Sequence, residues 1–232
     1  MHGYTDCVKL LLAQKDIHVT AQDNEGWTPL HLAVQNGHIQ CMKLLLAHKG
    51  IDVNIQNKKG ATPLHLAGHN GSTQCVKLLL TVPGININSK TNDGFTALHI
   101  TSQNVHIGCV KLLLDHKQID VNSQTHNGVV PLHSAAYTGH TECVKLLLAM
   151  PGINVNAQIT ADVWNKGYTP LHLAAYYGYS ECVKALLLHP SINIHIKDNQ
   201  GNTPLQVAQS SSINYITKEF VIDILRQHAF FE

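Results

Sequence analysis

The sequence predicts an all-α solenoid in which short helix-turn-helix units stack on one another. The motif Thr-Pro-Leu-His, complete or with one change, begins at six positions: Thr28, Thr62, Thr96, Val130, Thr169 and Thr203. Four of the five intervals are 34 residues, and one is 39 because about five residues are inserted between Gln158 and Tyr168. A period of roughly 20–50 residues marks an array in which neighbouring repeats complete one continuous core.

The first helix of each unit is predicted at the motif itself. In the second copy, Thr62 supplies a hydroxyl for the helix N-cap, and Pro63 sits where a helix tolerates a missing N–H. Gly71 can take the positive φ that separates this helix from the next. The side chains expected to face inward from this helix are Leu64, Leu66 and Ala67.

The second helix of each unit is too apolar for a single narrow stripe, which predicts burial between flanking repeats. In the second copy its apolar side chains are Cys75, Val76, Leu78, Leu79 and Leu80. The segment from Ile85 to Asp93 then forms an extended finger that leads to the next motif.

These residues resemble the ankyrin repeat family, whose signature joins T-P-L-H-x-A to a Gly-His turn, a leucine-rich second helix and a finger ending in Asn. The resemblance runs from Gly3 to about His228 and implies an all-α ankyrin-repeat solenoid with β-hairpin-like fingers. We expect a single domain over 1–232, composed of a half repeat 1–26, repeats at approximately 27–60, 61–94, 95–128, 129–167 and 168–201, and a C-terminal capping repeat 202–232.

Two repeats break the local rules. Val105 stands where other copies have Gly, and a β-branched residue at positive φ costs roughly 1–2 kcal/mol. Val130 replaces the capping Thr, which removes on the order of 1 kcal/mol. We therefore expect the centre of the array to open before its ends.

The first element of the chain is predicted to be a lone second helix, because residues 1–4 align with residues 35–38. A terminal repeat needs a polar outer face, and this helix carries Val8, Leu10, Leu11 and Leu12. Either the sequence is a piece of a longer protein, which we favour, or this face meets a partner.

Composition points away from nucleic acid and membranes. The net charge is +1, charged residues make up 13% of the chain, and no apolar run approaches the ~18 residues that span a bilayer. We expect a cytoplasmic protein. A column of lysines on the second helices is interpreted as a solvated face, partly neutralised by acidic neighbours, rather than as a polyanion site: Lys9, Lys43, Lys77, Lys111, Lys145 and Lys184.

All six cysteines hold the same position in their second helices: Cys7, Cys41, Cys75, Cys109, Cys143 and Cys182. Equivalent residues of stacked helices lie roughly 8–10 Å apart, too far for a disulfide. We expect reduced, buried core residues; the alternative is a redox or metal role.

Histidine is abundant, with 17 copies, yet the pattern favours structure over chemistry. The resemblance implies that the fourth motif residue bonds neighbouring backbone and the capping Thr; these residues are His31, His65, His99, His133 and His172. His69 follows His65 at zinc-ligand spacing, but no third ligand is placed. A cysteine and a histidine lie within one helical turn in several repeats. A catalytic pair is needed at only one site, so this repetition argues against a catalytic role. We expect no enzyme activity, no metal and no cofactor.

Binding positions follow from the resemblance, which implies that the concave side is lined by finger tips, the residue after the finger Gly and the residues ahead of the turn. The first repeats display amides and charges, and the later ones gather tyrosine. Tyr and Trp dominate interface hot spots. The predicted partner-binding residues are Trp27, Phe95, Tyr137, Thr138, Trp164, Tyr168, Tyr176 and Tyr177. The competing interpretation is that some rings only cover the seam between repeats.

The sequence thus predicts a non-enzymatic, monomeric scaffold that binds a partner protein through its groove and finger tips. Two alternatives remain: a targeting or regulatory module of a larger protein or microbial effector, and self-assembly through the uncapped first helix. By resemblance alone, four finger asparagines are candidates for hydroxylation, although their ordinary role is hydrogen bonding within the finger: Asn54, Asn88, Asn122 and Asn156.

Overall fold

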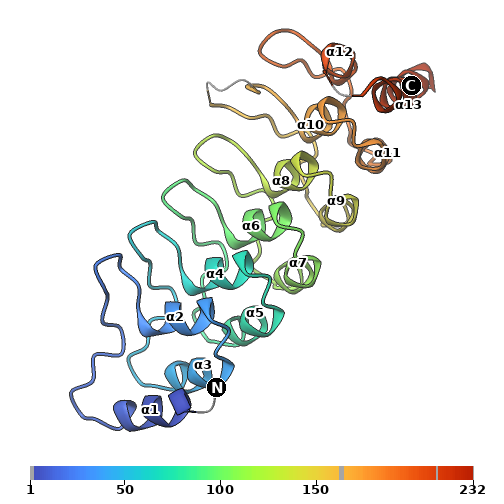
Figure 1. Cartoon of the computed structure of the whole chain (residues 1–232). Coiled ribbons are helices and arrows are strands. Elements are labelled where there is room, and N and C mark those ends of the chain that lie inside the picture. The colour runs from blue at the N-terminus through green and yellow to red at the C-terminus, as the bar shows by residue number, and fades with distance from the viewer. Residues whose placement is uncertain (1–2, 162–164, 213, 232) are drawn as a thin grey trace. The chain divides into compact units, whose positions relative to one another are not determined.

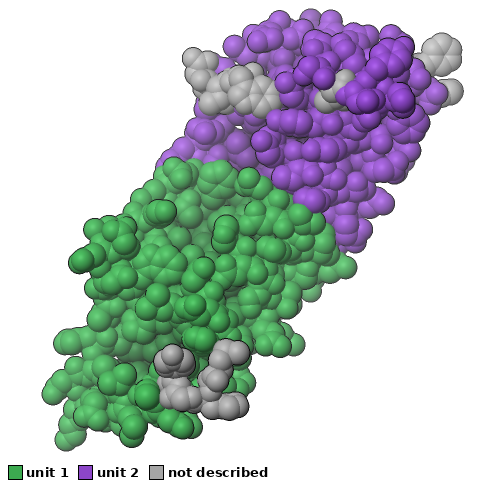
Figure 2. All heavy atoms as spheres, in the orientation of Figure 1, with its two compact units in different colours: residues 1–119 green, residues 120–232 purple. Residues whose placement is uncertain are grey.

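The computed structural model describes residues 3–161, 165–212 and 214–231, and in these ranges it contains thirteen α-helices and no strand (Figure 1). The all-α prediction is confirmed. The chain divides into two compact units, Met1–Ile119 and Asp120–Glu232 (Figure 2). The division falls inside the repeat predicted at 95–128, and each unit is described separately.

Unit 1 consists of two helix layers from which the fingers extend (Figure 1). The first helices α2, α4 and α6 pack in sequence, and so do the second helices α1, α3, α5 and α7. Their bounds are α1 Gly3–Leu12, α2 Pro29–Gln35, α3 Ile39–Leu46, α4 Pro63–His69, α5 Thr73–Leu80, α6 Ala97–Gln103 and α7 Ile107–Leu114.

Unit 2 repeats this arrangement and ends on a longer helix. First helices α8, α10 and α12 pack in sequence, as do α9, α11 and α13. Their bounds are α8 Pro131–Tyr137, α9 Thr141–Leu148, α10 Pro170–Tyr176, α11 Ser180–Leu187, α12 Pro204–Ser210 and α13 Tyr215–Phe231. Helix α13 has 17 residues and buries Val221, Ile222 and Leu225.

The motif histidine joins the start of its own helix to the following repeat. His31 Nδ1 accepts from the Thr28 backbone N–H at 3.2 Å and from the Thr28 hydroxyl at 2.8 Å. Because Nδ1 is an acceptor, the ring hydrogen lies on Nε2, which donates to the Ala61 carbonyl at 3.0 Å. The role implied by the ankyrin resemblance is confirmed.

The same bridge recurs in both units. His65 Nε2 donates to the Phe95 carbonyl at 3.0 Å, and His133 Nε2 donates to the Tyr168 carbonyl at 3.1 Å. Burial lowers the pKa of His31, His65 and His172, so the neutral ring is the stable form in the folded chain.

Val130 lacks the cap hydroxyl, as predicted, but most of the bridge survives. Its backbone N–H still donates to His133 Nδ1 at 3.1 Å. The Val130 side chain is 1% exposed, so burial of its methyl groups offsets part of the lost hydroxyl contact.

The fingers are tied to one another by asparagine side chains. Asn54 Nδ2 donates to the Gly84 carbonyl at 2.8 Å, and Asn54 Oδ1 accepts from the Asn86 N–H at 2.8 Å. The expectation that these amides bond within their own finger was wrong, because the partner lies in the next repeat. The other members donate likewise: Asn88 to Gln118, Asn122 to Gly152 and Asn156 to Ser191. Hydroxylation of these residues stays a prediction.

The inserted segment of unit 2 leaves the base of its finger unchanged. In an ordinary finger, Gln56 Nε2 donates to the Gly60 carbonyl at 2.8 Å, four residues ahead. In the lengthened one, Gln158 Nε2 donates to the Gly167 carbonyl, also at 2.8 Å but nine residues ahead. The base of the finger is therefore closed in the same way at both lengths.

Five of the eight side chains predicted for the core of the second copy are buried, and Leu66, Leu78 and Leu80 are only half-buried. Leu64 is 2% exposed, and Ala67 and Leu79 are fully buried. Leu66, expected to face inward, is half-exposed instead. On a helix of seven residues, Leu64 and Leu66 are two positions apart and cannot share one face.

Val105 adopts φ 65°, and it is the one non-glycine residue with positive φ in the part of the chain that the structure describes. The prediction from sequence is confirmed. Its side chain is 41% exposed, so little packing compensates for the strained backbone.

The motif histidines make stability depend on pH. Their folded pKa lies below the ordinary value of about 6.5, so the unfolded chain binds more protons just below that pH. We expect the histidine contribution to the free energy of unfolding to be constant well above pH 6.5 and to fall as the pH drops below it. Urea unfolding followed by circular dichroism at pH 7.5 and 5.5 measures the difference.

The chain supplies its own control for this effect. In α12 the motif histidine is replaced by Gln206, whose Oε1 accepts from the Thr203 N–H at 2.8 Å. A His31→Gln, His65→Gln, His172→Gln variant keeps that acceptor without a titrating ring. It should lose less stability between pH 7.5 and 5.5 than the parent, and equal losses would contradict the assignment.

The strain at Val105 is testable by substitution. Val105→Gly should raise the free energy of unfolding by about 0.5–1 kcal/mol, since relief of roughly 1–2 kcal/mol is partly cancelled by greater freedom of the unfolded chain. Gly37→Val is the matched control, because Gly37 has φ +65° and nothing within 4 Å of an added Cβ. That variant should lose a similar amount. A Val105→Gly variant no more stable than the parent in urea refutes the strain.

Candidate functional site

A groove lies in unit 1 between the fingers and the first helices. Its volume is about 550 Å³. We call it the unit 1 groove; it is lined by Trp27, Gln35, Asn57, Lys59, Ala61, His65, Leu66, His69, Thr91, Asp93, Phe95, Ile100, Gln103 and Asn104.

Two aromatic rings bound the hollow, with a small side chain between them. Trp27 and Phe95 hold the same repeat position as Ala61, which comes between them in the series. The Trp27 ring centroid lies 5.9 Å from that of His31, and the Phe95 centroid lies 5.7 Å from that of His99. Both rings are half-buried. Each ring therefore rests on a motif histidine and keeps part of its surface for a ligand.

The polar lining contains fixed and exposed groups. Asn57 is 7% exposed, and its Oδ1 accepts from the Lys59 and Ala61 N–H groups, both at 3.0 Å. The charged Lys59 and Asp93 side chains are exposed in the groove. The groove thus offers aromatic surface, amides and one charge of each sign.

Sequence reasoning found part of this groove and missed part. Trp27 and Phe95, both predicted binding residues, line it together. Leu66 and Ile100 were not predicted to line it. They hold the same repeat position, and this shared position could have identified them together.

The predicted aromatic residues of unit 2 form a second surface, which we call the tyrosine cluster: Tyr137, Tyr176 and Tyr177. The Tyr177 ring centroid lies 5.2 Å from that of Tyr137 and 5.0 Å from that of Tyr176, both edge to face. Tyr137 is 44% exposed, and the other two rings are half-buried. Edge-to-face pairs of this kind stabilise one another.

Two other predicted binding residues of unit 2 have side chains that pack or hydrogen-bond within the protein. Tyr168 is 8% exposed and stacks on His172 with a centroid distance of 5.3 Å. The Thr138 hydroxyl donates to the Ser134 carbonyl at 3.0 Å. Trp164 lies outside the described residues.

The phenols of Tyr168 and Tyr177 remain neutral at physiological pH. Burial, followed by the nearby Asp198, raises the pKa of Tyr168 to about 12. Burial also raises the pKa of Tyr177, and a hydrogen bond with Tyr137 adds to the effect. Tyr177 therefore contributes a hydrogen-bonding hydroxyl rather than an anion to the cluster.

The histidine pair considered for zinc is otherwise engaged. His65 uses Nδ1 toward Thr62 and Nε2 toward Phe95, as hydrogen bonds of 3.1 and 3.0 Å show. In the described ranges, no group of three or more His, Cys, Asp or Glu side chains is placed to hold a metal ion.

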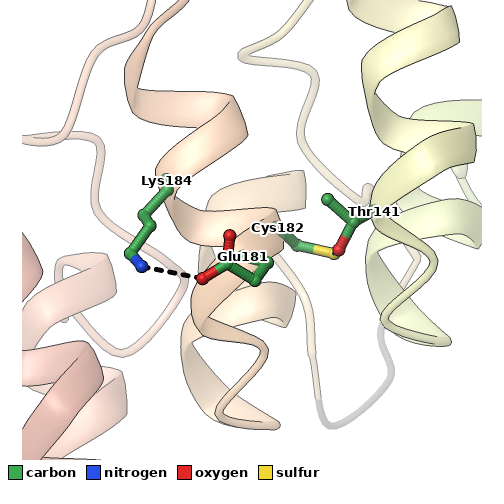
Figure 3. A network of polar contacts seen from close by, with 4 residues as sticks. All are labelled: Thr141, Glu181, Cys182 and Lys184. Carbon is green, nitrogen blue, oxygen red and sulfur yellow. Dashed lines mark hydrogen bonds and ion pairs between the residues drawn. The ribbon is translucent and has the colours of Figure 1, made fainter.

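Five of the six cysteines are buried. In Figure 3, Cys182 of α11 points toward Thr141 of α9, and its Sγ lies 3.4 Å from the Thr141 hydroxyl. Burial raises the pKa of Cys109 and of Cys143 to about 11, which disfavours the reactive thiolate. Figure 3 also shows Lys184 paired with Glu181 at 2.7 Å on the same helix.

Cys7 departs from the expected burial. It is exposed, because no described helix packs against the face of α1 that corresponds to the covered faces of α3 and α5. The expectation of six buried cysteines was wrong at this position.

We expect one fast-reacting thiol. In the native protein at pH 8, a small disulfide reagent should modify Cys7 at least about tenfold faster than the buried five, whose thiolates and access are both suppressed. Stopped-flow absorbance counts the fast thiols. Cys7→Ser should remove the fast phase, and a fast phase of two or more equivalents contradicts the burial pattern.

Among the residues that the structure describes, no helix has the length and apolar character needed to cross a bilayer.

The chain is similar to proteins of one family throughout. Family models for ankyrin repeats match residues 1–91 and 82–159 (three copies) and residues 161–208 (many copies). The comparison with curated proteins gave no significant match.

Solved ankyrin repeat domains share the fold. The domain of Bcl-3, described as a unique member of the IkappaB protein family, is 31% identical at a TM-score of 0.79 and covers 96% of this chain and 91% of its own. An ankyrin repeat domain from Acinetobacter baumannii AYE is 27% identical in sequence, with a TM-score of 0.74. The match covers 87% of this chain and 97% of that domain. The ankyrin repeat domain of human ASB11 is 27% identical in sequence, with a TM-score of 0.75. The match covers 97% of this chain and 93% of that domain. With the motif histidine bridges and these matches, the chain belongs to the ankyrin repeat family.

Proposed function

We propose that this protein is a non-enzymatic module that binds a segment of a partner protein in the unit 1 groove. Ankyrin repeats are in general protein–protein interaction modules. The observation that carries the proposal is the hollow of about 550 Å³ bounded by Trp27 and Phe95. Pockets of this size, with apolar walls and a few placed polar groups, suit a ligand side chain.

The lining defines the chemistry of the partner segment. An apolar or aromatic side chain would fill the space above Ala61, between the two rings. An acidic and a basic group on either side would reach Lys59 and Asp93, which lie in adjacent repeats. A segment of mixed charge with one large apolar residue fits this groove best.

The tyrosine cluster is proposed as a second contact surface for a partner. Three adjoining tyrosine rings, one of them exposed and two half-buried, resemble the composition of interface hot spots. Exposure of Tyr137 supports this role, since the same rings could otherwise serve only packing.

We further propose that the protein works as a monomer in the cytoplasm and binds neither nucleic acid nor membranes. Five buried free cysteines suit a reducing compartment. The net charge of +1 provides no electrostatic attraction to polyanions.

Three variants test the two surfaces. The groove variant is Gln35→Ala, Lys59→Ala, Asp93→Ala, in which all three side chains are exposed and their loss should not unfold the chain. The cluster variant is Tyr137→Ala, Tyr176→Ala, Tyr177→Ala. The control is Lys43→Ala, Lys77→Ala, Lys111→Ala on the second helices of unit 1, where the side chains are equally exposed.

Affinity capture from lysate with mass spectrometry identifies candidate partners, and calorimetry measures their affinity. A true partner should bind the groove variant at least about tenfold more weakly, because two charged contacts and one amide contact of the groove are lost together, and bind the lysine control unchanged. Circular dichroism confirms folding of each variant. Partners that bind the groove and cluster variants as tightly as the parent would contradict the proposal.

A further inference from the structure

The tips of three successive fingers of unit 1 carry charges of alternating sign. Glu25, Lys59 and Asp93 hold one repeat position, at intervals of 34 residues. All three side chains are exposed, and among the described residues none of the three makes a side-chain hydrogen bond or an ion pair. We call these three residues the charge row. Their charges are therefore available to a partner.

Backbone hydrogen bonds set the spacing of the charge row. Within the second finger, the Asn57 N–H donates to the Ala61 carbonyl at 3.0 Å. Between fingers, the Lys58 N–H donates to the Glu25 carbonyl at 2.9 Å, and the next finger repeats this bond to the Lys59 carbonyl at 3.0 Å. Hydrogen-bonded extended segments lie about 4.8 Å apart, and each finger contributes two, so successive charges lie about 9–10 Å apart.

Close packing of the tips keeps this spacing rigid. A Cβ placed on Gly26 would lie 2.9 Å from the Lys58 nitrogen, and one placed on Gly60 would lie 2.6 Å from the Asn92 nitrogen. The Asn92 side chain also donates to the Lys58 carbonyl at 2.8 Å. The three charges are therefore held in position before any partner binds, which lowers the entropy lost on association.

The charge row borders the unit 1 groove. Lys59 and Asp93 line the groove, and Ala61 lies in the same repeat as Lys59. A segment that places an apolar side chain over Ala61 therefore has Lys59 beside it. Charges at the border of a binding site contribute register and specificity more than affinity.

The spacing and the size of the groove indicate an extended occupant. A polyproline II chain brings every third side chain to the same face after about 9.3 Å, which matches the charge row. In a β-strand, every third side chain points to the opposite face. An α-helix spans the same distance in seven residues, but a cylinder about 10 Å wide over two intervals occupies roughly 1,600 Å³. The groove has a volume of about 550 Å³ and is too small for such a helix.

We propose that the unit 1 groove binds a polyproline II segment of the partner in which a basic, an acidic and a basic residue follow at every third position. The basic residues pair with Glu25 and Asp93, and the central acid pairs with Lys59. An apolar residue near that acid enters the hollow over Ala61. This inference rests on the proposed function and adds the conformation, length and charge order of the bound segment.

Seven-residue peptides with blocked ends test the charge order. The probes are Lys-Pro-Pro-Glu-Leu-Pro-Lys and Lys-Pro-Leu-Glu-Pro-Pro-Lys, which cover both chain directions, and the same pair with every charge reversed. Each is titrated to millimolar concentration into isotope-labelled protein by NMR. We expect one of the first two to shift the amides of Lys59, Ala61 and Asp93 and to bind at least about tenfold more tightly than its reversed counterpart. This preference should shrink in 1 M sodium chloride.

Reversing the charge row should reverse the preference. The variant Glu25→Lys, Lys59→Glu, Asp93→Lys changes only exposed side chains without side-chain bonds, so the fold should be kept. Asp23 and Lys58 keep their charges, so the opposite preference should be smaller, at about threefold. A change in sign cannot come from partial unfolding.

The matched control reverses three lysines on the second helices of unit 1, where they are equally exposed. It should keep the preference of the parent; its substitutions are Lys43→Glu, Lys77→Glu and Lys111→Glu.

Ala61→Phe separates the charge order from binding in the groove. Phe95 holds the same repeat position, so the fold should accept the ring, while the hollow is filled and the charge row stays unchanged. Peptide binding should be lost.

Two results would overturn the charge order. One is equal binding of both charge orders to the parent, or an unchanged preference in the charge-row variant; loss of binding in Ala61→Phe would then still support the groove as a binding site. The other is the absence of shifts with every peptide, after which the response of captured partners to the groove variant decides the proposed function separately.

Discussion

The neutral imidazole of the motif histidine is the contact on which the rest of the structure depends. Its Nδ1 secures the start of one helix, and its Nε2 holds the carbonyl of the residue after the next finger glycine. The residue held in this way is Ala61, Phe95 or Tyr168, depending on the repeat. Because the bond is made to backbone, the side chain at that position can vary without loss of the fold. The bond that builds the array therefore also fixes in space the side chains that a partner would meet.

Local signals explain why so much of the fold could be predicted from sequence. The period, the capping threonines and the glycines at positive φ each act within a few residues, and Val105 could be recognised because it breaks that local pattern. The errors arose where a neighbour decides the outcome. Cys7 is not covered by any helix that the structure describes, Leu66 lies on a helix too short to show its periodicity, and Asn54 bonds to the following finger. None of these outcomes is encoded within one repeat.

The candidate site was predictable in its residues but not in its form. Because Trp27 and Phe95 hold the same repeat position, the sequence predicted that they lie on the same side of the array. The hollow between them, however, exists because the intervening repeat carries the small residue Ala61 at that position. The tyrosines of unit 2 were recognised as a group from composition, whereas their division into surface rings and the buried Tyr168 required coordinates.

The lengthened finger of unit 2 shows that chain can be added at a tip without disturbing the stack. Gln158 closes the base of that finger on Gly167 across nine residues with the same 2.8 Å bond that Gln56 makes across four. The His133 bridge to Tyr168 likewise keeps the geometry found where no residues are added. A finger tip is thus a permissive site for grafting: a fluorophore, an epitope or a recognition loop of foreign sequence can be inserted there and presented at a defined place on a rigid frame.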